Sequence, residues 1–232
     1  MQKNPRHVAI ILDGNRRFAK SLNLDPWKGH EYGEKKVRKL LDWCKEYGIK
    51  ELTLYAFSMQ NFNRPKIEFD YLMKLFIDAA KRLLEDEDLK KNNLKIRWVG
   101  RISLFPQDVQ NAIKELEEKT KGNDGYTLNM AMAYGGKEEL ADAMKKIAEK
   151  IKSGSLRPED ITEETIAENL YVQSEPDLII RTGGEKRTSN FLMWQSAYSE
   201  WIFLDKKWPE FEKEDFEECL KEYSQRERRL GK

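Results

Sequence analysis

The sequence predicts an α/β fold: a single domain with a mainly parallel six-stranded sheet flanked by helices. Short apolar stretches of strand length alternate with amphipathic stretches of helical spacing through most of the chain. Several of the strand-like stretches are apolar throughout, which is typical of strands covered on both faces. The 232 residues suit one large domain, and no linker or internal repeat divides them. We therefore expect one domain over residues 1–232.

The six expected strands are short runs rich in β-branched, aromatic and other apolar residues. In chain order they are His7–Leu12, Glu51–Ser58, Leu94–Gly100, Tyr126–Tyr134, Asp177–Thr182 and Trp201–Leu204. The first, second and fifth are continuous apolar runs. Because helical patterns separate most of them, crossover connections are expected, with helices on both faces of the sheet.

The expected helices have apolar residues three and four positions apart, which places these residues on one face. These patterns run from Val37 to Cys44, Phe69 to Leu84, Val109 to Leu116, Leu140 to Ile151 and Phe216 to Tyr223. Pro106 suits the start of the third helix. Ser153 and Gly154 suit the end of the fourth.

Composition excludes several classes of protein. Lys and Arg number 42 and Asp and Glu 41, and a net charge of +1 argues against a nucleic-acid-binding protein. The two cysteines and two histidines form no zinc-ligand pattern, and a disulfide framework is not expected. No apolar run approaches the ~20 residues of a membrane span, and the N-terminus lacks the apolar core of a signal peptide. We expect a cytoplasmic protein.

Four polar clusters follow four of the expected strands. They are Asp13 to Arg17, Ser58 to Arg64, Tyr134 to Gly136 and Arg181 to Asn190. In open α/β sheets, ligands bind beyond the carboxyl ends of the strands. The clusters therefore indicate one site, rich in arginine and glycine, at this edge of the sheet.

The chemistry of the clusters suits a diphosphate. Gly14 allows a tight turn, and the helix expected after it offers N–H groups to an anion. Arginines can grip phosphate oxygens in a bidentate manner, and the candidates are Arg17, Arg64, Arg181 and Arg187. Asp13 would repel a phosphate unless a cation such as Mg²⁺ bridges them, and Glu200 is a candidate second carboxylate. Nucleotide-binding glycine motifs are absent from the sequence. Taken alone, the turn at Asp13 and Gly14 could also be a surface turn with an ion pair.

Taken together, four blocks resemble the cis-prenyltransferase family, which undecaprenyl diphosphate synthase represents in bacteria and archaea. They are "HVAIILDGNRRFAK", "YAFSMQNFNRP", "LNMAMAYGG" and "DLIIRTGGEKRTSNFLMWQSAYSE". The resemblance runs in order from His7 to the C-terminal "RERRLG". It implies a Mg²⁺-dependent transferase that condenses isopentenyl diphosphate repeatedly onto an allylic diphosphate. Each step forms a cis double bond. The product would be a long polyprenyl diphosphate, a precursor of glycosyl carrier lipids.

The resemblance also implies residue roles, which we carry over position by position. Catalysis is assigned to Asp13, Asn15 and Asn61. The allylic diphosphate is assigned to Gly14, Asn15, Arg16, Arg17, His30, Ser58, Phe62 and Arg64. Isopentenyl diphosphate is assigned to Arg181, Arg187, Ser189, Arg229 and Gly231, and Mg²⁺ to Asp13 and Glu200. The proton acceptor stays open between Asn15, Ser58 and the diphosphate itself.

The sequence departs from the family pattern at Pro26. Many bacterial members have an arginine at this position, four residues before the histidine that matches His30. One positive charge expected beside the allylic diphosphate is therefore either missing or supplied by Lys28. The starter therefore stays open between farnesyl and geranylgeranyl diphosphate, and the archaeal, geranylgeranyl-specific type is favoured.

A growing prenyl chain requires apolar space, since each buried CH₂ contributes roughly 0.8 kcal/mol. We expect a tunnel walled by the apolar face of Phe69–Leu84, with room left by Ala56, Ala131 and Ala133. An ordinary core is the alternative. Release of the product implies transient contact with a membrane surface.

The tail Gln225–Gly231 is basic and could simply be the end of the last helix. The resemblance implies instead a homodimer in which Arg229 and Gly231 serve the partner's site, with much of the interface formed by residues 190–203. Two other functions are alternatives. A non-catalytic partner subunit would lack the Asp-Gly-Asn block, which is intact here, and a nucleic-acid binder would need more positive charge.

Overall fold

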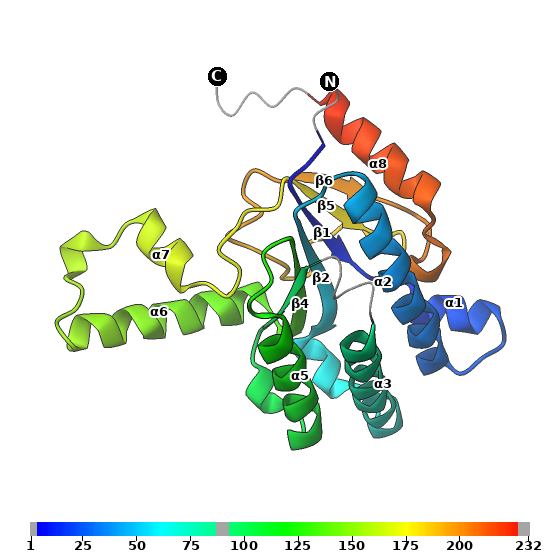
Figure 1. The fold of residues 1–232 in the computed structure, drawn as a ribbon, viewed down its shortest axis with the longest axis horizontal. Helices are drawn as coiled ribbons and strands as arrows, with labels where there is room; N and C mark the ends of the chain where they lie inside the picture. The colour runs from blue at the N-terminus through cyan, green and yellow to red at the C-terminus, as the bar shows by residue number, and fades with distance from the viewer. Residues whose placement is uncertain (1–3, 87–92, 227–232) are drawn as a thin grey trace.

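The computed structural model describes residues 4–86 and 93–226, and these form a six-stranded sheet with helices packed around it (Figure 1). All strand pairs are parallel, and the strand order is β3-β4-β2-β1-β5-β6. The strands are β1 His7–Ile11, β2 Glu51–Ser58, β3 Leu94–Val99, β4 Tyr126–Tyr134, β5 Leu178–Arg181 and β6 Glu200–Phe203. The predicted fold class and the six predicted strands are thus confirmed, with ends that differ by at most one residue.

The helices follow the strands as crossover connections require. The α-helices are α1 Asn15–Ser21, α2 Gly29–Glu46, α3 Lys66–Glu85, α5 Gln107–Thr120, α6 Gly136–Lys152, α7 Glu163–Asn169 and α8 Lys213–Gln225. Short 3-10 turns lie between them at η1 Pro26–Lys28, η2 Met59–Asn63, η3 Ile102–Leu104, η4 Pro158–Asp160 and η5 Trp208–Glu210. The sequence pattern did not indicate α7, which is too short to show a clear period. Thr162 caps it by accepting a bond from Thr165 N at 3.3 Å.

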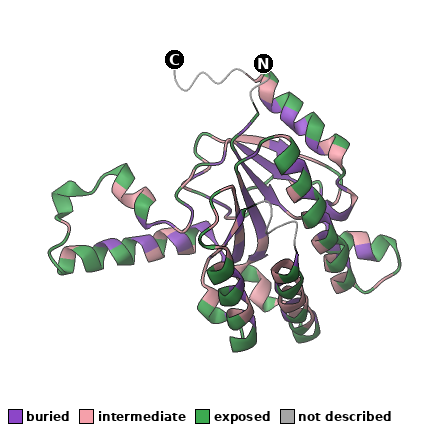
Figure 2. Cartoon of the chain, in the orientation of Figure 1, coloured by how far each residue is buried: buried purple, intermediate pink, exposed green. Residues whose placement is uncertain are grey.

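Alternate residues of the strands face the two sides of the sheet, as the pleat dictates. On one side Val8 and Ile10 pack in a core with α2 and α8, to which Trp43 and Phe216 belong. On the other side Ala9, Ile11 and Ile179 pack against a segment that includes Val172, Phe191 and Leu192. A third cluster joins the ends of β2 and β4 to α3 and α5. Figure 2 shows the strands as the mostly buried centre of the molecule.

Helices α6 and α7 form an arm that extends away from the sheet (Figure 1). The first turn of α6 is anchored: the buried Glu139 accepts bonds from Tyr171 N at 2.8 Å and from Gln195 Nε2 at 3.0 Å. Further along, much of α6 is exposed, and Met144 is 68% exposed. Within residues 4–86 and 93–226, every helix is too short or too polar to span a lipid bilayer.

Candidate active site

The candidate site lies where the strand order reverses. From β1 the chain proceeds to β2 on one side, whereas β5 lies on the other, and Ile11 pairs with Tyr55 and with Arg181. Diverging connections at such a point leave a crevice beyond the carboxyl ends of the strands. Asp13, Ser58 and Arg181 stand at those ends, so the structure brings together three of the predicted clusters.

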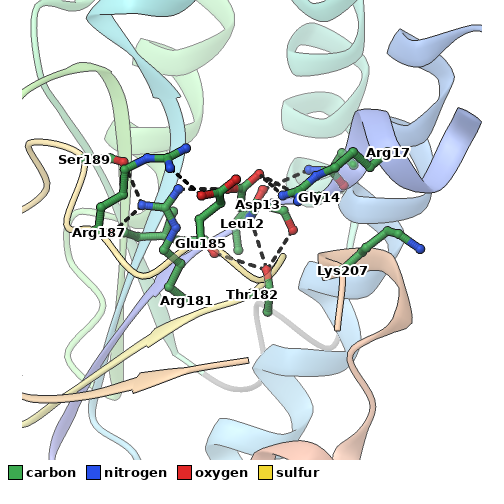
Figure 3. Close-up of polar contacts among 12 residues, drawn as sticks. Leu12, Asp13, Gly14, Arg17, Arg181, Thr182, Glu185, Arg187, Ser189 and Lys207 are labelled. Atoms are coloured by element: carbon green, nitrogen blue, oxygen red, sulfur yellow. Dashed lines mark hydrogen bonds and ion pairs between the residues drawn. The ribbon is translucent and has the colours of Figure 1, made fainter. Parts of the chain in front are cut away.

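Asp13 is the centre of a polar cluster (Figure 3). Its Oδ1 accepts a bond from Gly14 N at 2.6 Å and from Arg17 Nη2 at 3.2 Å, and its Oδ2 accepts one from Arg181 Nη2 at 2.8 Å. The Asp13 side chain is still 29% exposed. The carboxylate is therefore fixed by two cations and a backbone amide while it keeps a free approach from the solvent side.

Arg181 is a buried cation that links Asp13 to the loop after β5. Its Nη1 donates to Ser189 Oγ at 2.7 Å and to the carbonyl of Arg187 (Figure 3). Ser189 and the next residue, Asn190, have positive φ values of 51° and 63°. Asn190 in turn accepts a bond from Lys137 N at 2.8 Å, which fixes this strained loop on the start of α6.

Thr182 and Lys207 also hold the turn that carries Asp13: Thr182 belongs to the predicted cluster after β5 but had no role assigned, and Lys207 was not predicted. The buried Thr182 hydroxyl accepts from Asp13 N at 3.2 Å and donates to Asp13 O at 2.9 Å. Gly14 has φ +103°, and a Cβ there would lie 2.7 Å from the Cβ of Lys207. The turn therefore requires glycine for its backbone angle and for the close approach of Lys207.

We expect Gly14→Ala to destabilise the protein and to displace Asp13. A positive φ costs a non-glycine residue about 1–2 kcal/mol, and the contact with Lys207 adds to this cost. Gly48→Ala is the matched control, because Gly48 has φ +71° and open space around it. Urea unfolding should show a larger loss for Gly14→Ala than for Gly48→Ala. Equal losses would mean that the contact with Lys207 does not constrain the turn.

A small cavity of about 320 Å³ opens beside Asp13 and is strongly cationic. Its lining residues are Leu12, Asp13, Gly14, Asn15, Arg16, Arg17, Lys20, His30 and Arg64. Six of these were predicted to bind the allylic diphosphate, and the structure brings them together. Lys20 was not predicted. Lys28, the predicted substitute for the missing arginine, lies outside this lining.

His30 lines this cavity and contacts Arg64. Its Nε2 lies 3.2 Å from Arg64 Nη1 and 3.7 Å from Glu68 Oε1. Burial lowers the pKa of His30 below its ordinary value, and the positive charge of Arg64 and Arg16 adds to the effect against the opposing influence of Glu68.

Asn15 lies at the first turn of α1 and is almost fully buried. Its Nδ2 donates to Leu12 O at 3.0 Å, while its Oδ1 has no hydrogen-bond partner among the described residues. Glycines at 29 and 33 make room for it, since a Cβ at either position of α2 would overlap Asn15. The "KGHEYG" stretch thus contributes two close-packing glycines besides His30.

A second, larger cavity of about 1180 Å³ lies between α2, α3 and the sheet. Its apolar walls include Val37 and Leu41 of α2, Leu75, Phe76, Ala79 and Leu83 of α3, and Trp98, Leu128 and Met130 of the sheet. The predicted wall on α3 and the predicted contribution of Ala56 are present. The prediction that Ala131 and Ala133 leave room in this cavity is wrong. Both are buried in the two other core clusters and do not line it.

The Ser58 block forms the edge of the larger cavity. Ser58 and Asn61 line it, and Ser58 N donates to Asn61 Oδ1 at 3.0 Å, which caps η2. Phe62 points elsewhere, into a cluster of aromatic rings with Phe57 and Phe105 at 5.1 Å and 5.5 Å between centroids. Its predicted contact with the allylic diphosphate stays a prediction that this position does not favour.

Of the residues predicted to bind isopentenyl diphosphate, Arg181 and Ser189 come together beside Asp13. The Arg187 guanidinium is 60% exposed and pairs with Glu185, so its carbonyl rather than its side chain contacts Arg181. Arg229 and Gly231 lie outside the described residues.

Within a single chain, Glu200 and Asp13 lie at opposite edges of the sheet and do not share a metal site as predicted. Glu200 begins β6 and pairs in register with Leu178, at the amino ends of the strands, whereas Asp13 follows the carboxyl end of β1. Through Leu178, Glu200 is level with Val8 of β1, which precedes Asp13 by five residues, or about 16 Å along the strand direction. Glu200 instead accepts a bond from Arg226 Nη1 at 2.5 Å. A residue that precedes a strand belongs to the opposite edge from one that follows it.

Asp13 has the chemistry to hold Mg²⁺. Its carboxylate is a hard oxygen ligand, and it borders both cavities. Within residues 4–86 and 93–226, no group of three or more histidine, cysteine, aspartate or glutamate side chains could form a protein cage. Mg²⁺ in proteins is often held by one or two carboxylates together with substrate phosphates and water, and Asp13 fits that arrangement.

Comparisons with known proteins agree with this arrangement. Residues 11–231 match the prenyltransferase family model for undecaprenyl diphosphate synthase. The chain is 50% identical to the tritrans,polycis-undecaprenyl-diphosphate synthase (geranylgeranyl-diphosphate specific) of Methanocaldococcus jannaschii, over 98% of this chain and 83% of that protein. It is 47% identical to an isoprenyl transferase of Thermus thermophilus, over 98% of this chain and 89% of that protein. The crystal structure of lavandulyl diphosphate synthase from Lavandula x intermedia, in complex with dimethylallyl diphosphate, superposes with a TM-score of 0.92 at 37% identity and 99% coverage of each chain.

Proposed function

Because this chain belongs to the undecaprenyl diphosphate synthase family of prenyltransferases, we propose that it condenses isopentenyl diphosphate repeatedly onto geranylgeranyl diphosphate. Each condensation forms a cis double bond. The product is a long-chain polyprenyl diphosphate that serves as the precursor of a glycosyl carrier lipid. The starter is proposed from the named specificity of the archaeal relatives, which are 46–50% identical to this chain.

One observation supports this proposal above the others: the cationic cavity and the apolar cavity share a boundary. Asp13, Asn15, His30 and Arg64 line both. A ligand that spans them has a small anionic head and a long apolar body, which describes a prenyl diphosphate. Nucleotides and sugar phosphates would leave the apolar cavity unfilled.

The allylic substrate places its diphosphate in the smaller cavity and its prenyl chain between α2 and α3. As the diphosphate leaves, negative charge builds on its oxygens, and the guanidiniums of Arg16, Arg17 and Arg64 lie where they can stabilise it. Each CH₂ of the chain contributes roughly 0.8 kcal/mol by leaving water. The reacting carbon then lies at the junction of the two cavities, beside Asn15.

Isopentenyl diphosphate binds on the other side of Asp13, by the loop after β5. Arg181 and Ser189 are held there in a fixed geometry, so the second substrate meets groups that require little rearrangement. Arg187, Arg229 and Gly231 complete this site. Asp13 would hold Mg²⁺, which would supply positive charge to offset that of the diphosphates, while Arg181 and Ser189 bind and orient isopentenyl diphosphate.

We propose that the protein acts as a homodimer; because Glu200 lies at the other edge of the sheet from Asp13 within one chain, its implied role at the metal requires a second chain. Residues 190–203 suit an interface: Met193 and Tyr198 are 44% and 69% exposed although they are large and apolar or aromatic. We propose that Arg229 and Gly231, which lie outside the described residues, serve the partner's isopentenyl diphosphate site. We expect a cytoplasmic enzyme that contacts a membrane surface during product release and does not bind nucleic acid.

The function is tested by measuring incorporation of radiolabelled isopentenyl diphosphate with geranylgeranyl or farnesyl diphosphate as starter. We expect Mg²⁺-dependent incorporation with a higher kcat/KM for geranylgeranyl diphosphate. Chromatography of the dephosphorylated product gives its length. A preference for farnesyl diphosphate would overturn the starter, and incorporation with neither would overturn the function.

Product release should limit steady-state turnover, because a long prenyl chain makes many contacts in the apolar cavity. We expect detergent or lipid vesicles to accelerate steady-state turnover several-fold. Single-turnover condensation, measured by rapid quench, serves as the control and should not change. Equal steady-state rates with and without detergent would contradict a buried chain.

A further inference from the structure

A buried carboxylate lies behind the cationic cavity and does not line it. Glu68, in the first turn of α3, is 1% exposed. Its Oε1 lies 3.0 Å from Arg64 Nη1, 3.6 Å from Arg16 Nε and 3.7 Å from His30 Nε2. Neither cavity includes Glu68 in its lining, whereas all three of its neighbours line the smaller one.

The three neighbours come from separate parts of the chain. Arg16 belongs to α1, His30 to α2, and Arg64 to the turn that precedes α3. Two guanidiniums directed at one small cavity repel each other, and a carboxylate between them removes that repulsion. Glu68 thus makes it possible for three elements to present basic groups to the same space before any ligand arrives.

Contacts with Arg16, His30 and Arg64 compensate for the cost of burying the Glu68 carboxylate. A carboxylate removed from water is costly unless it is paired and hydrogen-bonded. The pKa of Glu68 lies below its ordinary value, first through the contact with His30 and then through the positive charge of Arg64 and Arg16. One anion against two guanidiniums leaves a net positive charge on the cavity side.

We propose that Glu68 is a positioning residue for the allylic diphosphate: it holds Arg16, His30 and Arg64 in the arrangement that binds this group. The inference rests on the proposed function of the cavity. Glu68 acts through its neighbours and has no direct contact with the substrate. Its influence is confined to the allylic side, because Arg181 and Ser189 are held by different contacts, on the other side of Asp13.

The test compares Glu68→Gln, which keeps the shape and removes the charge, with wild type. We expect the KM for the allylic diphosphate to rise about tenfold or more, as for loss of a charge-assisted hydrogen bond. The KM for isopentenyl diphosphate should change less than twofold. Glu68→Asp keeps the charge and should recover part of the loss. Asp70→Asn is the matched control, because Asp70 is an exposed carboxylate on the same helix that pairs with Lys66.

A purely structural role for Glu68 predicts a different pattern. Thermal stability would fall, but the two KM values of the folded fraction would remain at wild-type levels, and this outcome overturns the proposal. Equal rises in both KM values would also overturn it. If Glu68→Gln does not fold, Glu68→Asp carries the test, since its shorter side chain retracts from Arg64; an unchanged allylic KM would then refute the proposal. Failure of the proposed function is distinguishable, because the wild type itself would then lack activity.

Discussion

Replacing Asp13 by alanine should lower kcat by about 100-fold to 1,000-fold or more while the protein remains folded. Asp13 is the carboxylate at the junction of both cavities, and its oxygens face Arg17 and Arg181. Its loss removes the proposed Mg²⁺ ligand and leaves two guanidiniums without their shared anion. Interactions that stabilise charge in the transition state typically contribute factors of this size.

The Asp13→Ala experiment needs evidence that the fold survives and that the loss is specific. Circular dichroism and the urea midpoint give the first. Asp70→Ala removes an exposed carboxylate of α3 and should leave activity unchanged. EDTA should silence the wild type and added Mg²⁺ should restore it. Near-normal Mg²⁺-dependent turnover by Asp13→Ala would refute the assignment of the site.

The second large effect is expected from Arg181→Met, which should lower kcat/KM for isopentenyl diphosphate about 100-fold, as the loss of several charge-assisted hydrogen bonds implies. Arg181 is 3% exposed and holds Asp13, Ser189 and the Arg187 carbonyl together. Methionine retains the apolar length of the side chain but none of its donors. Arg181→Lys should recover little activity, because an ammonium cannot reproduce the planar, forked geometry of a guanidinium.

The diagnostic quantity for Arg181 is the ratio of the two substrate effects. The KM for the allylic diphosphate should change much less than that for isopentenyl diphosphate. Arg157→Met, an exposed arginine between α6 and α7 that pairs with Asp160, is the control and should behave as wild type. A rise in the allylic KM alone would mean that the two diphosphates occupy the opposite sites.

The sheet could be predicted from the sequence because burial on both faces leaves a plain signal. Strands such as β1 and β5 are buried along their whole length, and their ends are marked by Asp13 and by Thr182 and Gly183. The cluster positions followed from the same reasoning, since every parallel strand ends at one edge. Helix α7 was missed because seven residues do not establish a helical period.

The contacts inside the site could not be predicted, because they depend on tertiary distances. Nothing in the sequence distinguishes Glu68 from the many exposed glutamates on helices, although its place four residues after Arg64 was a weak signal. The close packing of Gly14 on Lys207 joins residues almost two hundred positions apart. Glu200 was expected beside Asp13 through the resemblance, yet the register of β6 places it at the other edge of the sheet within one chain.

We propose that one continuous site holds an anionic head among Arg16, Arg17, His30 and Arg64 and an apolar chain between α2 and α3. A crystal structure with Mg²⁺ and a non-reactive thio-analogue of geranylgeranyl diphosphate would show where both parts of the ligand bind. We expect the diphosphate in the smaller cavity beside Asp13 and the prenyl chain along Leu75, Ala79 and Leu83. A diphosphate bound away from these basic residues, or a prenyl chain on the opposite face of the sheet, would contradict it.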